Sequence, residues 1–169
     1  MRLFFATLAA LMLSAQAIQA QVIIQADHGG MISEYLDRYE QIKKSGERVV
    51  IDGNCFSACT LVLGIVPPER ICVTSRANLG FHTAWFSDGG RQAYSEAGTG
   101  VLLENYPRNI LAWFNRYGGL SYKMLYLEGA ELARMYQPCG PGTWQAATST
   151  PPLRMTIRPP KPFHAHGLY

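Results

Sequence analysis

The sequence predicts an α/β protein with a single domain, in which helices pack on a mostly parallel sheet. Short β-branched runs alternate with stretches whose apolar residues recur every three or four positions, the pattern of strands separated by helices. The 169 residues leave no room for a second sizeable domain. The hydrophobic content of 48% excludes global disorder, and a net charge of +3 without any Lys/Arg block argues against nucleic acid as a partner.

Residues 1–20 predict a secretory signal peptide. Arg2 provides a positive start, residues 3–13 form an apolar run, and small residues follow, with cleavage after Ala17 or Ala20. A membrane anchor is the alternative, but this run is shorter than the ~20 residues that a spanning helix needs. We therefore expect an exported protein, periplasmic or secreted, that does not span the membrane after cleavage.

The first elements of the domain, which we place at residues 21–144, alternate strand and helix. Residues 22–24 and 49–51 are β-branched runs typical of buried strands. Between them, apolar residues at helical spacing predict a helix over residues 31–44, which Gly46 ends.

The rest of the domain continues this alternation. An apolar stretch halted by two prolines predicts a helix over residues 56–66. The remaining expected elements are strands at residues 70–74 and 79–86, a polar loop at residues 87–98, a helix at residues 99–117 kinked at Pro107, and a helix at residues 122–135.

Residues 145–169 differ in composition from the domain. They hold five prolines and no acidic residue, and show no apolar periodicity. This composition predicts a disordered tail.

Four cysteines follow the predicted signal peptide: Cys55, Cys59, Cys72 and Cys139. An even number in an oxidising compartment favours two disulfides. We expect Cys59–Cys72, because a helix and the strand that follows it pack as neighbours, and Cys55–Cys139, which would tie the last ordered segment over the site. Cys55–Cys59 is the rival pairing, which we expect to be strained because it closes so short a loop.

Zinc is the alternative role for Cys55 and Cys59, with His28 or His82 completing the site. Zinc sites usually carry closer Cys-x-x-Cys pairs or a clear histidine motif. We therefore predict no metal and no cofactor.

The candidate catalytic residues lie at the ends of predicted strands. Gly29 and Gly30 lie between a strand and a helix, where backbone amides can hold an oxyanion. Ser57 stands at the next strand-to-helix turn, beside the amide of Ala58, and His82 follows a further strand as a candidate general base. Each has a commoner alternative role: an ordinary turn, a helix N-cap serine and a packed core histidine.

Taken in chain order, these residues resemble the proteolytic subunit of the Clp protease, a member of the ClpP/crotonase-like superfamily. The resemblance covers about residues 22–137. It is carried by the Gly-Gly turn, by the Gly-x-Cys-x-Ser-Ala-Cys-Thr stretch that starts at Gly53, and by the Gly-Phe-His that ends at His82. More closely still, these motifs resemble a group of exported, periplasmic bacterial proteins of the same superfamily. The resemblance implies a ClpP/crotonase-like fold.

Carried over residue by residue, the resemblance implies that Ser57 is the nucleophile and His82 its base. It implies that Gly30 and Ala58 offer oxyanion amides, with Gly29 shaping the turn.

The third member of the triad departs from the family pattern. The family places an Asp on a later helical segment, whereas no Asp follows Asp88 in this chain. Glu131 is the preferred substitute, with Glu128 nearly equivalent, because a Glu orients the histidine in some hydrolase triads. His28 stands where the family has a proline.

Two functions from different classes remain. The first is an ATP-independent exported serine hydrolase that acts on a peptide or an ester by peptidase-like acyl transfer. The second is a non-catalytic periplasmic binding or envelope protein that retains the ClpP-like fold. The segments that build Clp rings and dock an unfoldase are not recognisable, so a large processive protease is not expected, although a homo-oligomer is compatible with the sequence.

Overall fold

The structure, a computed structural model, describes residues 20–140. The expected signal peptide, apart from Ala20, and the expected tail lie outside these residues. Contacts divide the chain into one unit that ends at Pro138 and a second that starts at Cys139, and the fold below is that of the first. Between residues 20 and 140 no helix has the length and hydropathy of a membrane span.

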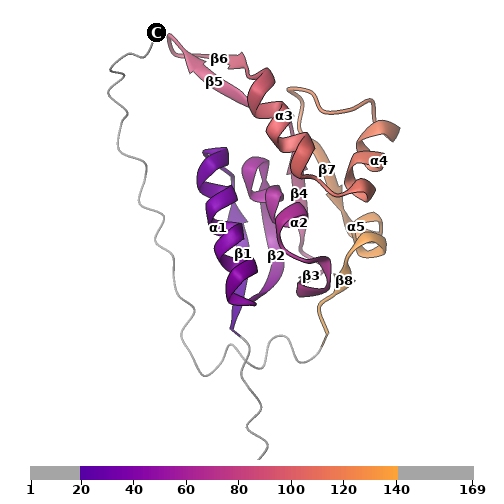
Figure 1. The fold of residues 1–169 in the computed structure, drawn as a ribbon. Coiled ribbons are helices and arrows are strands. Elements are labelled where there is room, and N and C mark those ends of the chain that lie inside the picture. Colours follow the sequence, from indigo (N-terminus) through magenta and orange to yellow (C-terminus); the bar gives the residue numbers. More distant parts are fainter. Residues whose placement is uncertain (1–19, 141–169) are drawn as a thin grey trace, which may run out of the picture. The chain divides into compact units, whose positions relative to one another are not determined.

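The unit is an α/β fold with a curled mixed sheet and flanking helices (Figure 1). Its strands are β1 (Gln21–Asp27), β2 (Arg48–Phe56), β3 (Ile71–Val73), β4 (Asn78–Phe81), β5 (Trp85–Asp88), β6 (Arg91–Tyr94), β7 (Leu125–Glu128) and β8 (Gln137–Pro138). Its helices are α1 (Ile32–Ser45), the 3-10 helix η1 (Ser57–Leu61), α2 (Val62–Ile65), the 3-10 helix η2 (Pro68–Arg70), α3 (Glu96–Asn105), α4 (Arg108–Arg116) and α5 (Gly129–Met135).

Strand β2 is the centre of the sheet. Strand β1 pairs with it in parallel along one edge. Along the other edge, the first half of β2 pairs in parallel with β3, and its last residues, Asn54 to Phe56, pair in parallel with β4. Strand β8 continues the sheet in parallel beside β3, whereas β7 runs antiparallel to β4. The sheet is therefore mixed, with β4 at the carboxyl end of β2.

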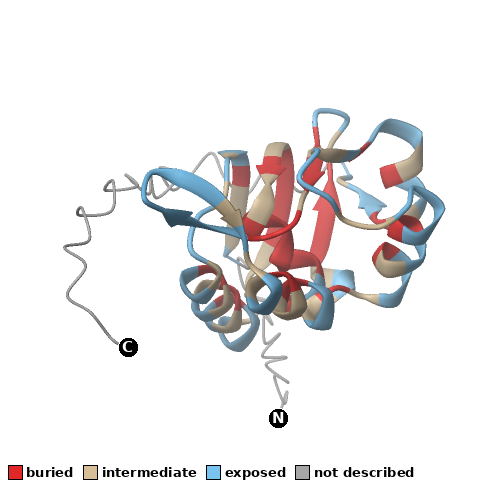
Figure 2. Cartoon of the chain, turned by 90° about the horizontal axis from the view of Figure 1, so that it is seen from above, coloured by how far each residue is buried: buried red, intermediate tan, exposed pale blue. Residues whose placement is uncertain are grey.

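Helix α1 covers one face of the sheet because its apolar residues repeat at helical spacing. Tyr35, Tyr39 and Ile42 are buried, and Gly46 ends the helix with a φ of 80°. In Figure 1, α1 and α2 lie side by side in front of β1 and β2. Figure 2 shows the strands as the buried centre of the fold, with the outer surfaces of the helices exposed.

An aromatic cluster fixes strand β4 against the helices that follow it. The ring of Phe81 lies 5.6 Å from those of Tyr106 and Trp113 and 5.2 Å from that of Phe114. Phe81 is fully buried and is the residue directly before His82. The cluster therefore holds the carboxyl end of β4 in place.

The prediction of a loop at residues 87–98 is wrong in part. Residues 85–94 form the hairpin β5–β6, joined by Gly89 and Gly90, whose φ values are 54° and 85°. Two successive positive φ values are typical of a type I′ hairpin turn, which Gly-Gly favours. The hairpin extends from the sheet with its residues largely exposed (Figure 2).

Two expected helices are also corrected. The helix expected at residues 122–135 begins as strand β7, where exposure alternates along Leu125–Glu128 and β4 provides the pairing partner. The helix expected at residues 99–117 breaks at Pro107 into α3 and α4, because proline cannot donate the helical hydrogen bond.

Candidate active site at the carboxyl ends of three strands

The sheet brings together three turns that are far apart in sequence. Asp27 pairs with Cys55, and Phe56 pairs with Gly80, so β1, β2 and β4 end side by side. Neighbouring strands lie about 4.8 Å apart. The residues that follow these ends are Gly29 and Gly30, Ser57 and Ala58, and His82.

Gly29 lies directly against the Ser57 turn. A Cβ added at Gly29 would lie 2.7 Å from Phe56 O, 2.7 Å from Ser57 Cβ and 2.9 Å from Ala58 N. Gly29 also has a φ of 82°, a conformation that side chains rarely adopt. Only glycine fits here, and its presence allows the first turn to approach the second this closely.

Ser57 has an unusual backbone conformation. Its φ is 55°, and within residues 20–140 no other non-glycine residue has a positive φ. The N-cap of η1 is Phe56 rather than Ser57, and no side chain caps this helix. Ser57 is half-buried, and its hydroxyl makes no hydrogen bond to any described residue. The helix-capping role that serine usually plays at such a turn therefore does not account for it.

Two buried hydroxyls hold the carbonyl of Ser57. Thr60 Oγ1 donates to Ser57 O at 2.6 Å, and the Tyr106 hydroxyl lies 2.7 Å from Thr60 Oγ1. Because Thr60 uses its one hydroxyl hydrogen on Ser57, Tyr106 must be the donor in the second bond. Burial raises the pKa of Tyr106, so the hydroxyl keeps its proton. A strained residue persists only where its surroundings fix it, and these bonds are part of that support.

A disulfide spans Ser57, which corrects the expected pairing. Cys55 is bonded to Cys59, with their Cα atoms 5.3 Å apart, so neither Cys59–Cys72 nor Cys55–Cys139 forms. The left-handed residue and the 3-10 turn between the two cysteines bring their Cα atoms within disulfide range. Cys72 and Cys139 are also disulfide-bonded, and no cysteine of the described chain is free.

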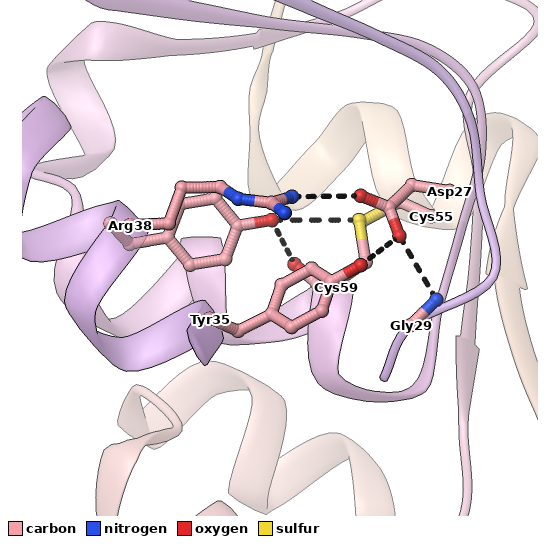
Figure 3. Close-up of polar contacts among 7 residues, drawn as sticks. Asp27, Gly29, Tyr35, Arg38, Cys55 and Cys59 are labelled. Carbon is pink, nitrogen blue, oxygen red and sulfur yellow. Dashed lines mark hydrogen bonds and ion pairs between the residues drawn. A yellow bond between two sulfur atoms is a disulfide. The ribbon is translucent and has the colours of Figure 1, made fainter. Parts of the chain in front are cut away.

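The carboxylate of Asp27 shapes the glycine turn (Figure 3). Its Oδ1 accepts a hydrogen bond from Gly29 N at 2.9 Å and another from the Tyr35 hydroxyl, and its Oδ2 forms an ion pair with Arg38 at 3.3 Å. The amide of Gly29 is therefore committed to Asp27. Gly30 N has no partner among the residues that the structure describes, and it remains able to donate.

Ala58 provides a second amide at the same place. It lies in the first turn of η1, where amides lack a partner within the helix. Its nitrogen faces the Gly29 turn at close range. The backbone amides of Gly30 and Ala58 thus lie on two turns that Gly29 allows to approach each other closely.

His82 has a defined tautomer. Its Nδ1 lies 2.7 Å from the carbonyl oxygen of Thr83, and since a carbonyl only accepts, Nδ1 carries the hydrogen. Nε2 is then free to accept a proton. Thr83 N donates in turn to Ser121 O at 2.9 Å, which anchors the segment. In the described part of the chain, His82 and Ser57 make no hydrogen bond with each other.

The structure does not bring Glu131 or Glu128 to His82. Glu128 pairs with Asn78 at the start of β4, whereas His82 follows the end of that strand. Glu131 accepts hydrogen bonds from Arg116 at 3.1 Å and from Tyr117 at 3.2 Å. Antiparallel pairing of β7 thus carries both carboxylates to the opposite end of β4.

Aromatic side chains border the Ser57 turn. The ring of Phe56 lies 5.7 Å from that of His28 and 5.7 Å from that of Tyr126. Gly80 allows this, because a Cβ there would lie 2.6 Å from the Phe56 ring. His28, at the position where the resemblance expects proline, is exposed beside this ring, and Tyr126 is 51% exposed.

Sequence reasoning missed the polar residues of α1. Tyr35 and Arg38 contact Asp27, and Tyr39 contacts Cys59, although the apolar spacing of residues 31–44 predicts only a helix there. The available signal was their spacing of three and four residues, one helix face, downstream of an aspartate at a strand end. No group of three or more metal-ligating side chains occurs over residues 20–140.

Comparisons with known proteins leave the chain without a family. It matches no family model and no curated protein. Among solved structures it is similar to one described as "an Enzyme", with a TM-score of 0.44 and 6% sequence identity, covering 71% of this chain and 77% of that chain.

Proposed function

We propose that this protein is an exported serine hydrolase that acts on a peptide or an ester by acyl transfer, without an ATP-driven partner. Ser57 is the nucleophile, His82 the general base, and the amides of Gly30 and Ala58 the oxyanion donors. The proposal includes a ClpP/crotonase-like fold, and its support is that the glycine turn, Ser57 and His82 follow neighbouring parallel strands in the order of the sequence resemblance. Paired cysteines support export to an oxidising compartment.

The observation that carries the proposal is the left-handed backbone of Ser57. Strained residues cluster at active sites, and hydrolases that carry their nucleophile on a sharp strand-to-helix turn expose its Oγ in this way. Here the turn sits between two cysteines joined to each other and against a glycine with no room for a Cβ. A serine held so firmly, whose hydroxyl makes no hydrogen bond to any residue between 20 and 140, suits a nucleophile.

The reaction follows from these groups. Ser57 Oγ attacks the substrate carbonyl carbon while its proton passes to His82 Nε2, and the carbonyl oxygen takes the negative charge between the amides of Gly30 and Ala58. The carbon–leaving group bond then breaks, and His82 returns the proton to the leaving group. Water attacks the acyl-enzyme through the same histidine, which regenerates Ser57 and releases the acid.

One observation favours the non-catalytic alternative. Within the described residues no carboxylate contacts His82, whose Nδ1 is held by a backbone carbonyl instead. A carbonyl fixes the tautomer but gives less support to the imidazolium than a carboxylate does. A protein that binds a peptide or an envelope component with this fold is therefore the second candidate.

A fluorophosphonate probe tests the proposal. We expect the purified mature protein to be labelled, and Ser57→Ala and His82→Ala to remain unlabelled. Ser95→Ala is the matched control, because Ser95 is an ordinary N-cap serine whose side chain accepts from Gly98 N. Labelling that survives Ser57→Ala, or a wild-type protein that never reacts, would favour the binding function.

A further inference from the structure

We propose that helix α1 positions both halves of the oxyanion site, with Asp27, Tyr35 and Tyr39 as the positioning residues. The role of these residues in catalysis rests on the proposed function, whereas the contacts of α1 with the two turns do not depend on it. Helix α1 begins directly after the Gly29–Gly30 turn and packs against η1, which carries Ser57 and Ala58.

The first connection runs to the glycine turn through Asp27. Its side chain is 13% exposed and bonds to Gly29 N on one side and to Tyr35 and Arg38 of α1 on the other. Arg38 also lies over the Tyr35 ring, 4.5 Å from its centroid. Through these bonds of the Asp27 carboxylate, the position of α1 determines the position of the turn that carries the Gly30 amide.

The second connection runs to the serine turn through Tyr39. Its hydroxyl donates to Cys59 O at 2.8 Å and lies 3.6 Å from Cys59 Sγ. Tyr39 is 1% exposed, so water does not compete for this bond. Cys59 is joined to Cys55 across Ser57, so the bond fixes the turn that presents the Ala58 amide.

Tyr35, Arg38 and Tyr39 lie on one face of α1, so a single rigid element sets both connections. The distance between the two oxyanion amides then depends on the helix rather than on the turns alone. An oxyanion hole needs its donors at defined positions before the reaction starts, and a small misplacement lowers the rate strongly.

The test compares Asp27→Ala, Asp27→Asn and Tyr39→Phe with Tyr136→Phe, a control that removes the hydroxyl of another buried tyrosine, the residue that ends α5. Two readouts are taken: the rate constant and affinity of fluorophosphonate inactivation, and amide hydrogen exchange, normalised to β3. We expect Asp27→Ala to lower the inactivation rate constant roughly ten- to hundredfold with little change in probe affinity. Asn keeps an acceptor for Gly29 N, so Asp27→Asn should stay within about threefold of wild type.

Exchange should accelerate at Gly29, whose amide loses its acceptor, in Asp27→Ala and at residues 57–60 in Tyr39→Phe, but at neither place in Tyr136→Phe. Unchanged exchange in both variants would overturn the inference, as would an Asp27→Asn as slow as Asp27→Ala. If wild-type protein does not react with the probe, the proposed function fails, and exchange alone then decides the positioning role. If Asp27→Ala does not fold, the comparison of Tyr39→Phe with Tyr136→Phe decides it.

Discussion

Replacing Gly29 by alanine tests the close approach of the two turns. Two costs are expected. The first is the positive φ, which costs an L-residue about 1–2 kcal/mol. The second is the overlap of the new Cβ, under 3.0 Å, with Phe56 O, Ser57 Cβ and Ala58 N. None of these atoms is the far end of a flexible side chain, so the overlap should cost about 1–3 kcal/mol more.

Gly119→Ala is the matched control. Gly119 has a φ of 85°, almost the same as Gly29, but a Cβ there meets nothing within 4 Å. We therefore expect a loss of about 2–5 kcal/mol for Gly29→Ala against about 1–2 kcal/mol for Gly119→Ala. Urea unfolding, followed by the fluorescence of the buried Trp113, measures both. Equal losses in the two variants would refute the packing of the glycine turn on Ser57.

Two further predictions concern the support of β2. Burial alone would raise the pKa of Asp52, but hydrogen bonds from Thr74 and Arg76 hold it below its ordinary value of 3.8. The stability that Asp52 contributes is therefore present above its ordinary pKa of 3.8 and is lost as pH falls through its lower pKa in the folded protein, and Asp52→Asn should flatten this part of the stability–pH curve. A stability–pH curve of Asp52→Asn that runs parallel to that of the wild type would contradict this role of Asp52. Tryptic mapping without reduction should give one peptide that contains both Cys55 and Cys59 and is lighter by two hydrogens, and finding either cysteine linked to another peptide would disprove the pairing.

The first half of the fold was predictable because local pattern and tertiary structure agree there. The β-branched runs became β1 and β2, and the helical spacing before Gly46 became α1. The second half was harder. Exposed and less exposed residues alternate over only four positions, residues 125–128, which is too short a pattern to predict a strand. These residues form β7 because they pair with the edge of β4. The Gly89–Gly90 pair is typical of a hairpin turn, but the polar composition around it predicts a loop, and the structure has the hairpin.

The meeting of the glycine turn, Ser57 and His82 follows from strand order, since parallel strands end at one edge of a sheet. The cysteine pairing did not follow, because it depends on the φ of Ser57, which no sequence pattern reports. The surroundings of Glu131 did not follow from the sequence for a related reason: the direction of β7 decides where Glu131 lies, and strand direction is a property of the whole sheet.

The choice of residue at position 57 weighs against a purely structural turn. Glycine adopts a φ of 55° freely, whereas serine does so at a cost. The chain nevertheless has serine there, and it fixes the turn from several directions: a disulfide across it, Thr60 on its carbonyl and Tyr39 on the carbonyl of Cys59. If the turn served only to connect β2 to η1, a glycine would give the same path with less support. The strain is explained if the hydroxyl itself is needed, held beside the amides of Gly30 and Ala58, and that is the arrangement a hydrolase nucleophile requires.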